Sequence, residues 1–469
     1  WRLNDRLTLN LGVRYELTKP FIDENDAITG IDLSKQSSKY PNAPKGLVYP
    51  GDPGVPRGII PTDKNNFAPR ISLVWDPRGN ARTSVRTGFG IFYDALAGQG
   101  DFFQSGVLSP PFTPLVELNT PANITLQDPL GPGTPSANPF PANLTIIGWG
   151  TDFQTPYAYH YNLGVQHQIT NRIGAEVAYV ASRSYHLPIF MEINPGTYVP
   201  GQTVAGPRVL APYYALLRPT FSEARSWYDS LQTSIRMLPT RGINFMAAYT
   251  WSHAIDHVSG LNIGGESRPV LPVVQGDKAS VDAALKAEKG DALFDVRHRF
   301  VLSFGYELPR LASKSGLVQG VLGGWQVNGI YQAQTGFPFT VVDSVVTIQY
   351  LTNRANVTCD PNDGPKNTTQ WFNTSCFQRR PVAQTGPDKP SNQGRNGVRG
   401  PGFQRTDLSL FKNFDFAGHH RVQVRVEAFN LWNQARFGQP VSNPGASNFG
   451  AITAAEDGRV MQFGIKYSF

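Results

Sequence analysis

Twelve stretches of the chain alternate apolar and polar residues at every second position, and this pattern constrains the fold more than any other feature. The first runs from Leu7 to Leu17, where six alternate positions in a row are apolar. In a chain with 40 % hydrophobic residues, chance produces such a run at a frequency of only about 0.004, whereas a strand with one apolar and one polar face requires it. The other stretches are 71–75, 85–93, 159–169, 173–181, 227–237, 243–251, 300–308, 325–333, 408–416, 422–428 and 462–469.

The connections between these stretches alternate between short turns and long loops. Turn residues such as Asp76-Pro77 and Pro239-Thr240 join the members of each pair. The loops between pairs include 94–156 and 336–404. Unstructured loops of this length are uncommon in soluble domains, and a soluble β-sandwich does not explain the difference in length. Outer-membrane barrels combine short periplasmic turns with long extracellular loops.

The sequence therefore predicts an all-β fold, an antiparallel transmembrane β-barrel of the outer membrane with about 12 strands in this chain. In hydrocarbon every backbone group must be bonded internally, so we expect the apolar face of a closed sheet to contact lipid. Aromatic residues at strand ends, such as Tyr15, Trp75 and Trp251, are expected to form the interfacial girdles. An even number of strands places Phe469 on the short-turn side, which we expect to be the periplasm.

Composition argues against other classes of protein. No run of about 18 apolar residues occurs, so we expect no transmembrane helix. The net charge of +7 comes from scattered rather than clustered Lys and Arg, which argues against a nucleic-acid partner. An anionic lipopolysaccharide or an anionic solute is the alternative partner for this charge.

The two cysteines, Cys359 and Cys376, lie in a polar, loop-like stretch. Two cysteines without a CxxC motif argue against a structural metal site. We expect a loop disulfide, which implies an oxidising compartment. Two unpaired thiols are the alternative.

No arrangement of residues predicts catalysis, and we expect no enzymatic activity, no cofactor and no metal site. His253 and His257 have a metal-ligand spacing, but they follow a strand and lack the acid of an HExxH motif. We expect ligand contacts in the loops instead, where exposed aromatic side chains can stack on a ligand. The candidate contacts are Tyr213, Tyr214, Trp371 and Phe372. The alternative is that these side chains pack the loops on one another.

The last eight residues resemble the C-terminal assembly signal of bacterial outer-membrane β-barrels. They form an alternating strand that stops on an aromatic residue, whereas chain termini are usually frayed and polar. The resemblance implies recognition by the barrel-assembly machinery. The positions that carry it are Gln462, Gly464, Tyr467 and Phe469. An ordinary edge strand is the alternative.

Several longer stretches resemble the barrel of TonB-dependent outer-membrane receptors, most closely the Oar-like group. They are 66–70 (NFAPR), 88–94 (GFGIFYD), 294–300 (FDVRHRF), 394–402 (GRNGVRGPG), 407–414 (DLSLFKNF) and 427–433 (EAFNLWN). The family's barrel is similar to a cylinder of about 22 strands with an internal plug. The resemblance implies that residues 1–469 are the C-terminal portion of such a barrel, without the plug and the N-terminal domain. The first residue is Trp1, not Met, so we expect a fragment.

The resemblance also implies a function. The chain would supply the wall and loops of a receptor that takes up a solute, such as a siderophore or a glycan, across the outer membrane. Its partners would be outer-membrane lipid and lipopolysaccharide, the solute, and TonB acting through the missing plug. Two alternatives are a self-contained twelve-stranded outer-membrane barrel, acting as a translocator or an enzyme, and a surface adhesion or structural β protein.

Overall fold

The computed structural model of the protein describes residues 1–94, 109–113, 139–140, 142, 144–195, 208, 210, 213–260, 270–309, 320–343, 353–380, 391–416 and 420–469. One sheet of 17 strands dominates this described part. Its long strands are β2 (Leu7–Tyr15), β5 (Phe67–Trp75), β6 (Thr83–Tyr93), β8 (Tyr157–Gln168), β9 (Ile173–Phe190), β10 (Tyr214–Thr240), β11 (Ile243–Asp256), β13 (His298–Glu307), β14 (Trp325–Gln334), β19 (Phe403–Asp415), β20 (Arg421–Phe429) and β21 (Val460–Ser468). Its short strands are β1 (Arg2–Asn4), β3 (Gly30–Ile31), β4 (Leu47–Val48), β7 (Leu144–Gly150) and β12 (Gly290–Asp291).

Smaller elements lie in the loops. The described residues contain two small sheets and two named helices. The sheets pair β15 (Pro338–Phe339) with β18 (Val398–Arg399), and β16 (Asn356–Val357) with β17 (Phe377–Gln378). The helices are α2 (Lys278–Glu288) and the 3-10 helix η1 (Thr374–Cys376). In the described part of the chain, no helix has the length and apolar character to cross a membrane.

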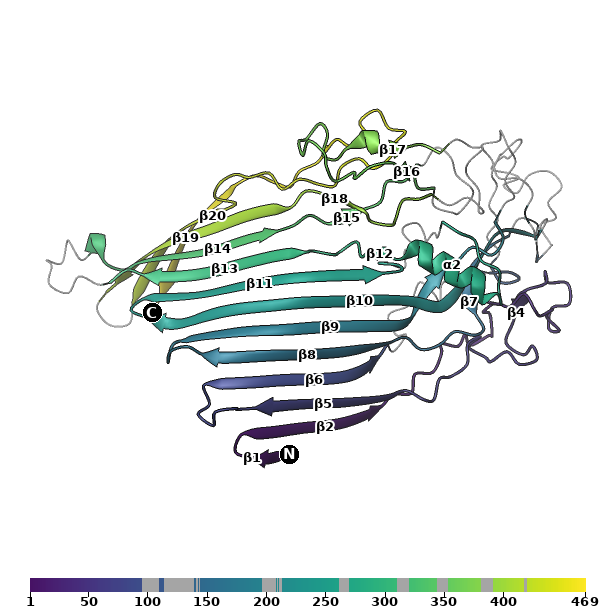
Figure 1. Ribbon diagram of the computed structural model, residues 1–469, viewed down its shortest axis with the longest axis horizontal. Coiled ribbons are helices and arrows are strands. Elements are labelled where there is room, and N and C mark those ends of the chain that lie inside the picture. Colours follow the sequence, from purple (N-terminus) through teal and green to yellow (C-terminus); the bar gives the residue numbers. More distant parts are fainter. Residues whose placement is uncertain are drawn as a thin grey trace.

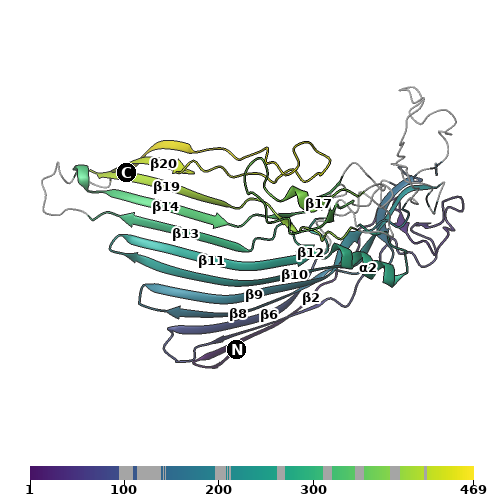
Figure 2. The same cartoon turned by 45° about the horizontal axis from the view of Figure 1, so that its top comes forward.

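The twelve long strands form one antiparallel meander, which confirms the predicted fold class. Each long strand pairs with the long strands before and after it, in the order β2, β5, β6, β8, β9, β10, β11, β13, β14, β19, β20, β21, and the short β1 pairs with the free side of β2. Figure 1 shows these strands side by side, and Figure 2 shows the curvature of the sheet. Within the described residues, no ladder joins β1 or β2 to β21.

The register of the ladders gathers the apolar residues on one face of the meander. Leu11 lies opposite Ile71, which lies opposite Phe89 in the next strand. At the other edge of the meander, Phe463 and Ile465 stand on the same face, and their side chains are 73 % and 79 % exposed. A contiguous apolar surface of this extent is characteristic of a face that contacts lipid or protein.

The opposite face of the meander carries charged and small residues. Arg70 lies opposite Gly12 on one side and Gly90 on the other. These glycines leave a shallow hollow of about 430 Å³ in the wall beside Arg70, which stacks on the ring of Phe92 at 4.5 Å. The ladders thus place polar and apolar residues on separate faces, as the alternation predicts.

The short connections are tight turns whose geometry follows from their residues. The carboxylate of Asp76 accepts hydrogen bonds from the amides of Arg78, Gly79 and Ala81, which closes the turn between β5 and β6. Between β10 and β11, Gly242 has a φ of +84°. A Cβ atom there would lie 2.2 Å from the carbonyl oxygen of Glu307, so only glycine fits.

The long connections gather at the opposite end of the sheet, around α2, β4 and β7 (Figures 1 and 2). There β9 and β10 extend beyond the wall, and β7 joins β10 in parallel. The sequence predicts that β10 starts at residue 227, whereas in the structure β10 begins at Tyr214. The extension carries buried side chains on both faces, including Leu216 and Leu217. A strand buried on both faces does not alternate, so the period-two pattern misses it.

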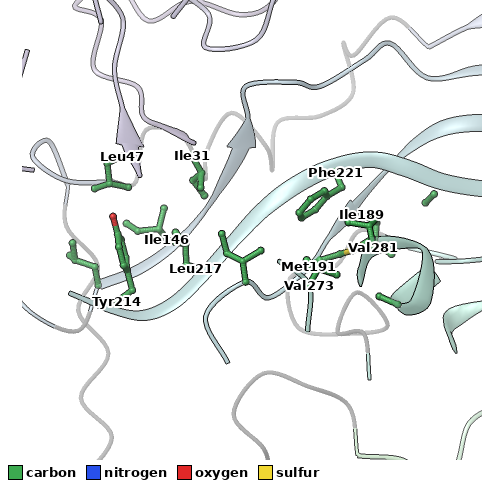
Figure 3. Close-up of a cluster of buried hydrophobic side chains, with 14 of the residues drawn as sticks. Ile31, Leu47, Ile146, Ile189, Met191, Tyr214, Leu217, Phe221, Val273 and Val281 are labelled. Atoms are coloured by element: carbon green, nitrogen blue, oxygen red, sulfur yellow. The ribbon is translucent and has the colours of Figure 1, made fainter. Parts of the chain in front are cut away.

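A hydrophobic core holds this extension together (Figure 3). Ile31, Ile146, Leu217 and Phe221 pack there with Val281 of α2. The helix is absent from the sequence prediction, although its signals are present. Its N-cap carboxylate at position 277 accepts two amide hydrogen bonds, and its buried residues follow a helical spacing.

Candidate functional site

The loop end of the sheet is the candidate site, because connections that are distant in the sequence fold there into one packed unit. Tyr214 is only 2 % exposed, and its hydroxyl donates to the carbonyl of Lys45 at 3.0 Å. Tyr49 is fully buried and donates to the carbonyl of Pro110 at 2.8 Å. Burial raises the pKa of both phenols, so both hydroxyls stay protonated and act as donors.

A buried carboxylate ties β9 to the extension of β10. Oε1 of Glu192 accepts from the amides of Asn194 at 2.9 Å and Leu217 at 3.2 Å. Oε2 lies 3.6 Å from Nε of Arg218, and both side chains are at most 2 % exposed. Burial raises the pKa of Glu192 because the guanidinium and the two amides only partly offset the lost hydration.

An ionic network joins two of the stretches that resemble receptor barrels, 294–300 and 394–402. Arg297 binds Asp291 and Asp295, each at 3.0 Å, and Arg399 contacts the same two carboxylates. The side chain of Asp295 is completely buried. Residues about one hundred positions apart therefore share one cluster of charges. This cluster ties the long loop that begins at 336 to the residues just before β13.

His253 extends this network toward the apolar face of the meander. Its Nε2 lies 2.8 Å from Oδ1 of Asp291. Burial acts to raise the pKa of Asp291, but the hydrogen bond from His253 and the charges of Arg399 and Arg297 together hold this pKa below its usual value. In addition to this contact of His253, His257 packs against the ring of Trp227. The described residues bring no group of three His, Cys, Asp or Glu side chains together in a way that could hold a metal ion.

A second buried ion pair holds the segment Gly394-Arg395-Asn396 in place. Arg395 contacts the carboxylate of Asp256, and each side chain is 2 % exposed. The same guanidinium donates to the carbonyls of Glu288 at 2.8 Å and Asp256 at 2.7 Å. Gly290 is required beside it, since a Cβ there would lie 2.3 Å from the carbonyl oxygen of Arg395. The arginine thus links the end of β11, the end of α2 and the long loop.

The cysteines lie in a small hydrophobic module of the same loop. Cys359 and Cys376 are joined by a disulfide, with their Cα atoms 5.1 Å apart. Cys376 packs in a cluster with Phe339, Phe372 and Phe377. The described residues contain no free cysteine.

The four candidate ligand contacts fall into different environments. Tyr214 and Phe372 are at most 2 % exposed and pack inside the loops, so burial corrects the expectation that they face a ligand. Trp371 is half-buried and donates from Nε1 to the carbonyl of Arg399 at 2.9 Å. Tyr213 is 52 % exposed and stays a candidate. The four side chains do not form one surface.

The predicted assembly-signal residues lie on β21 and just after it. Gln462 pairs with Glu427 and Gly464 with Arg425. A Cβ at Gly464 would be 4.0 Å from its nearest neighbour, so space alone does not demand glycine. Tyr467 shares a hydrogen bond with His420 at 2.7 Å, and Phe469 is 89 % exposed. The role of these residues as a signal stays a prediction.

Sequence reasoning missed the ionic network at the loop end. Asp256, Asp291 and Asp295 carried no recognisable spacing toward Arg395 and Arg399. The only signal was that both partner stretches resemble the same family. Which arginine meets which carboxylate depends on how the loops fold back onto the sheet.

A family model described as an outer membrane beta barrel domain matches residues 1–462. No curated protein matches the chain. Among solved structures it is similar to the outer membrane transporter YddB from Escherichia coli, with 11 % identity and a TM-score of 0.47 over 86 % of this chain and 41 % of that one. It is also similar to the siderophore receptor PirA from Acinetobacter baumannii, with 11 % identity and a TM-score of 0.45 over 100 % of this chain and 44 % of that one.

The chain spans less than half the length of these two solved proteins. At this identity the likeness concerns the fold and carries no argument about ligands. The family model covers nearly all of the chain and agrees with the meander, its apolar face and its two unlike ends. The chain therefore belongs to the outer membrane beta barrel domain family.

Proposed function

We propose that the chain is the C-terminal portion of a TonB-dependent outer-membrane receptor of the Oar-like type and takes part in uptake of a solute such as a siderophore or a glycan. The wall and the loops bind and admit the solute, and no step of this role is catalytic. TonB acts through a plug that is not among residues 1–469. The C-terminus faces the periplasm, and the barrel-assembly machinery recognises the end of β21.

The observation that carries the proposal is the contrast between the two ends of the sheet. One end has tight turns such as that at Asp76. At the other end, buried ion pairs, a disulfide and hydrophobic cores hold together the parts of the loops that the structure describes. Ordering long loops costs conformational entropy, and loops without a binding role do not need this order. A rigid outer platform is what a receptor needs in order to position a ligand above its lumen.

The sheet itself favours a wide barrel. In the described residues, β1 and β2 form no ladder with β21, so one edge at each side of the meander is without a partner there. In lipid such edges must be paired. We propose that further strands of the same barrel pair with them, to a total of about 22, and that the polar inner wall then surrounds a plug. The self-contained twelve-stranded barrel requires the missing ladder between β21 and β1 or β2.

Uptake measurements test the proposal. A strain without this protein is compared with its parent for uptake of a panel of ferric siderophores and oligosaccharides, with and without TonB depletion. We expect the loss of uptake of at least one solute, and TonB depletion should produce the same loss in the parent. Uptake that depends on the protein but is unchanged by TonB depletion would overturn TonB dependence. Unchanged uptake of every solute would overturn the receptor role.

A further inference from the structure

The lipid-facing side of the wall carries two groups of charged side chains near the loop end. The lower row consists of Arg183 and Asp229, and the upper row, nearer the loops, consists of Arg225 and Lys289. In the lower row, Arg183 binds Asp229 through two hydrogen bonds of 2.8 and 2.9 Å. The hydroxyl of Tyr179 donates to the same carboxylate. This cluster stands among apolar neighbours of the wall, and pairing is what allows charges to persist there. The lower row is therefore neutralised internally.

The upper row differs because its cations have aromatic partners instead of carboxylates. The guanidinium of Arg225 lies 5.6 Å from the ring centre of Tyr185, and Nζ of Lys289 lies 4.6 Å from that of Trp227. Both cations are exposed. Among the residues that the structure describes, neither forms an ion pair. A cation held over an aromatic face keeps its charge available to a further partner.

The position of the upper row on the wall follows from the ladder register. Tyr185 lies opposite Tyr157, and Trp227 lies opposite Arg183, all on the apolar face. Tyr157, Tyr159 and Tyr185 form ring contacts with one another at 5.3 to 5.6 Å, at the end of the strands where the loops begin. Aromatic residues cluster at the level of the lipid headgroups in outer-membrane barrels. The two cations stand directly at this level.

Several cations act on His257, which lies beside the upper row. His257 packs against Trp227 with ring centres 5.2 Å apart. Burial, together with the charges of Arg225, Arg395 and Lys289, lowers the pKa of His257 to about 4. The neighbouring acids are partly engaged, since Asp282 binds Lys278 at 2.9 Å. Glu223 is the other acidic side chain of this region, and it interacts with Lys278 as well.

We propose that Arg225 and Lys289 form a binding site for the phosphate groups of an anionic outer-leaflet lipid, on the outside of the wall. The site rests on the proposed membrane orientation, with the loops outside. Arg225 offers a planar fork that suits a phosphate, and Lys289 adds a point charge beside it. The aromatic rings fix both cations and contact the apolar part of the lipid below the phosphate.

The test is lipid binding to the purified full-length protein in detergent, measured by native mass spectrometry with lipid A as the probe. One basic residue near an anionic membrane surface contributes about 1 kcal/mol, so Arg225→Gln and Lys289→Gln should each weaken binding about fivefold and the double variant about twenty-five-fold. The matched control is Lys278→Gln, which removes a cation that already has a carboxylate partner. It should change binding less than twofold.

Two further measurements distinguish a bound lipid from a bound soluble anion. Lipid A without its phosphates should bind the wild type as weakly as intact lipid A binds the double variant, and free inorganic phosphate at millimolar concentration should not compete. Wild-type affinity in the double variant, or an equal loss in Lys278→Gln, would overturn the site. Effective competition by inorganic phosphate would show a soluble anion to be the ligand and would also overturn it. Solute uptake by the double variant is measured in parallel, so failure of the receptor role is scored separately.

Discussion

Replacing Arg395 by methionine should release the long loop from the sheet. The change removes the partner of a carboxylate, Asp256, whose side chain is 2 % exposed. It also removes donors to the carbonyls of Glu288 and Asp256. Breaking one member of a buried ion pair costs about 3–5 kcal/mol, because the remaining charge stays buried without its partner. Ser259 still donates to Asp256 at 2.8 Å, which favours the lower half of this range.

Hydrogen exchange measures this loss locally, in segment 391–400. At about 1.4 kcal/mol per factor of ten, a loss of about 3–4 kcal/mol should make its amides exchange roughly a hundredfold to several hundredfold faster in Arg395→Met. The double variant with Asp256→Asn should recover part of the protection, because it no longer buries a carboxylate whose arginine has been removed. Strand β20, which is remote from the pair, serves as the internal control. Unchanged exchange in 391–400, or a double variant less protected than Arg395→Met, would show that the pair of Arg395 and Asp256 does not hold the loop on the sheet.

Three further predictions address the disulfide, the faces of the sheet and an acidic anchor. Cys376→Ser opens the disulfide to Cys359 and should destabilise the loop by about 3 kcal/mol. Under oxidising conditions a protease should cleave the variant faster than the wild type, and after reduction the two should be cleaved at the same rate. Equal cleavage rates before reduction would contradict the prediction. Ile465→Lys places a charge on the apolar face and should lower the free energy of unfolding by urea in vesicles by about 2–4 kcal/mol. Lys466→Gln, on the opposite face, should change the same free energy by less than about 0.5 kcal/mol. Equal effects of the two variants would contradict the assignment of the faces. Burial opposes ionisation of Asp52, but amide and hydroxyl hydrogen bonds hold its pKa below the usual 3.8, so its stabilisation should be complete above pH 3.8 and lost as the pH falls through the folded value. Exchange in 37–52, corrected for intrinsic rates, should show this acid loss in the wild type and not in Asp52→Asn.

The wall of the barrel is predictable from the sequence because its physics is local. Each residue of a half-buried strand faces either lipid or the lumen, so alternation alone locates strands such as β2 and β21. Turn residues such as Asp76 mark the short connections for the same reason. Both signals lie within a few residues of the structure that they specify.

The loop end is less predictable because its contacts join distant segments. The extension of β10 is buried on both faces and has no alternation, so only its lower part is recognisable. Tyr214 and Phe372 are aromatic residues of predicted loops, and sequence does not distinguish a buried ring from an exposed one. The partners of Arg399 lie about one hundred residues away, and no local pattern encodes that pairing.

One face of the meander should contact lipid and the other should not, so accessibility should alternate from residue to residue along β2. Single cysteines are placed at positions 9 to 14, one at a time, in a protein with Cys359→Ala and Cys376→Ala, and each carries a fluorophore. In native outer membranes, a nitroxide-labelled lipid should quench the odd-numbered positions and aqueous iodide the even-numbered ones, in accord with the register of β2 and β5. Quenching by iodide at all six positions, or no alternation with either quencher, would show that β2 has no lipid-facing side.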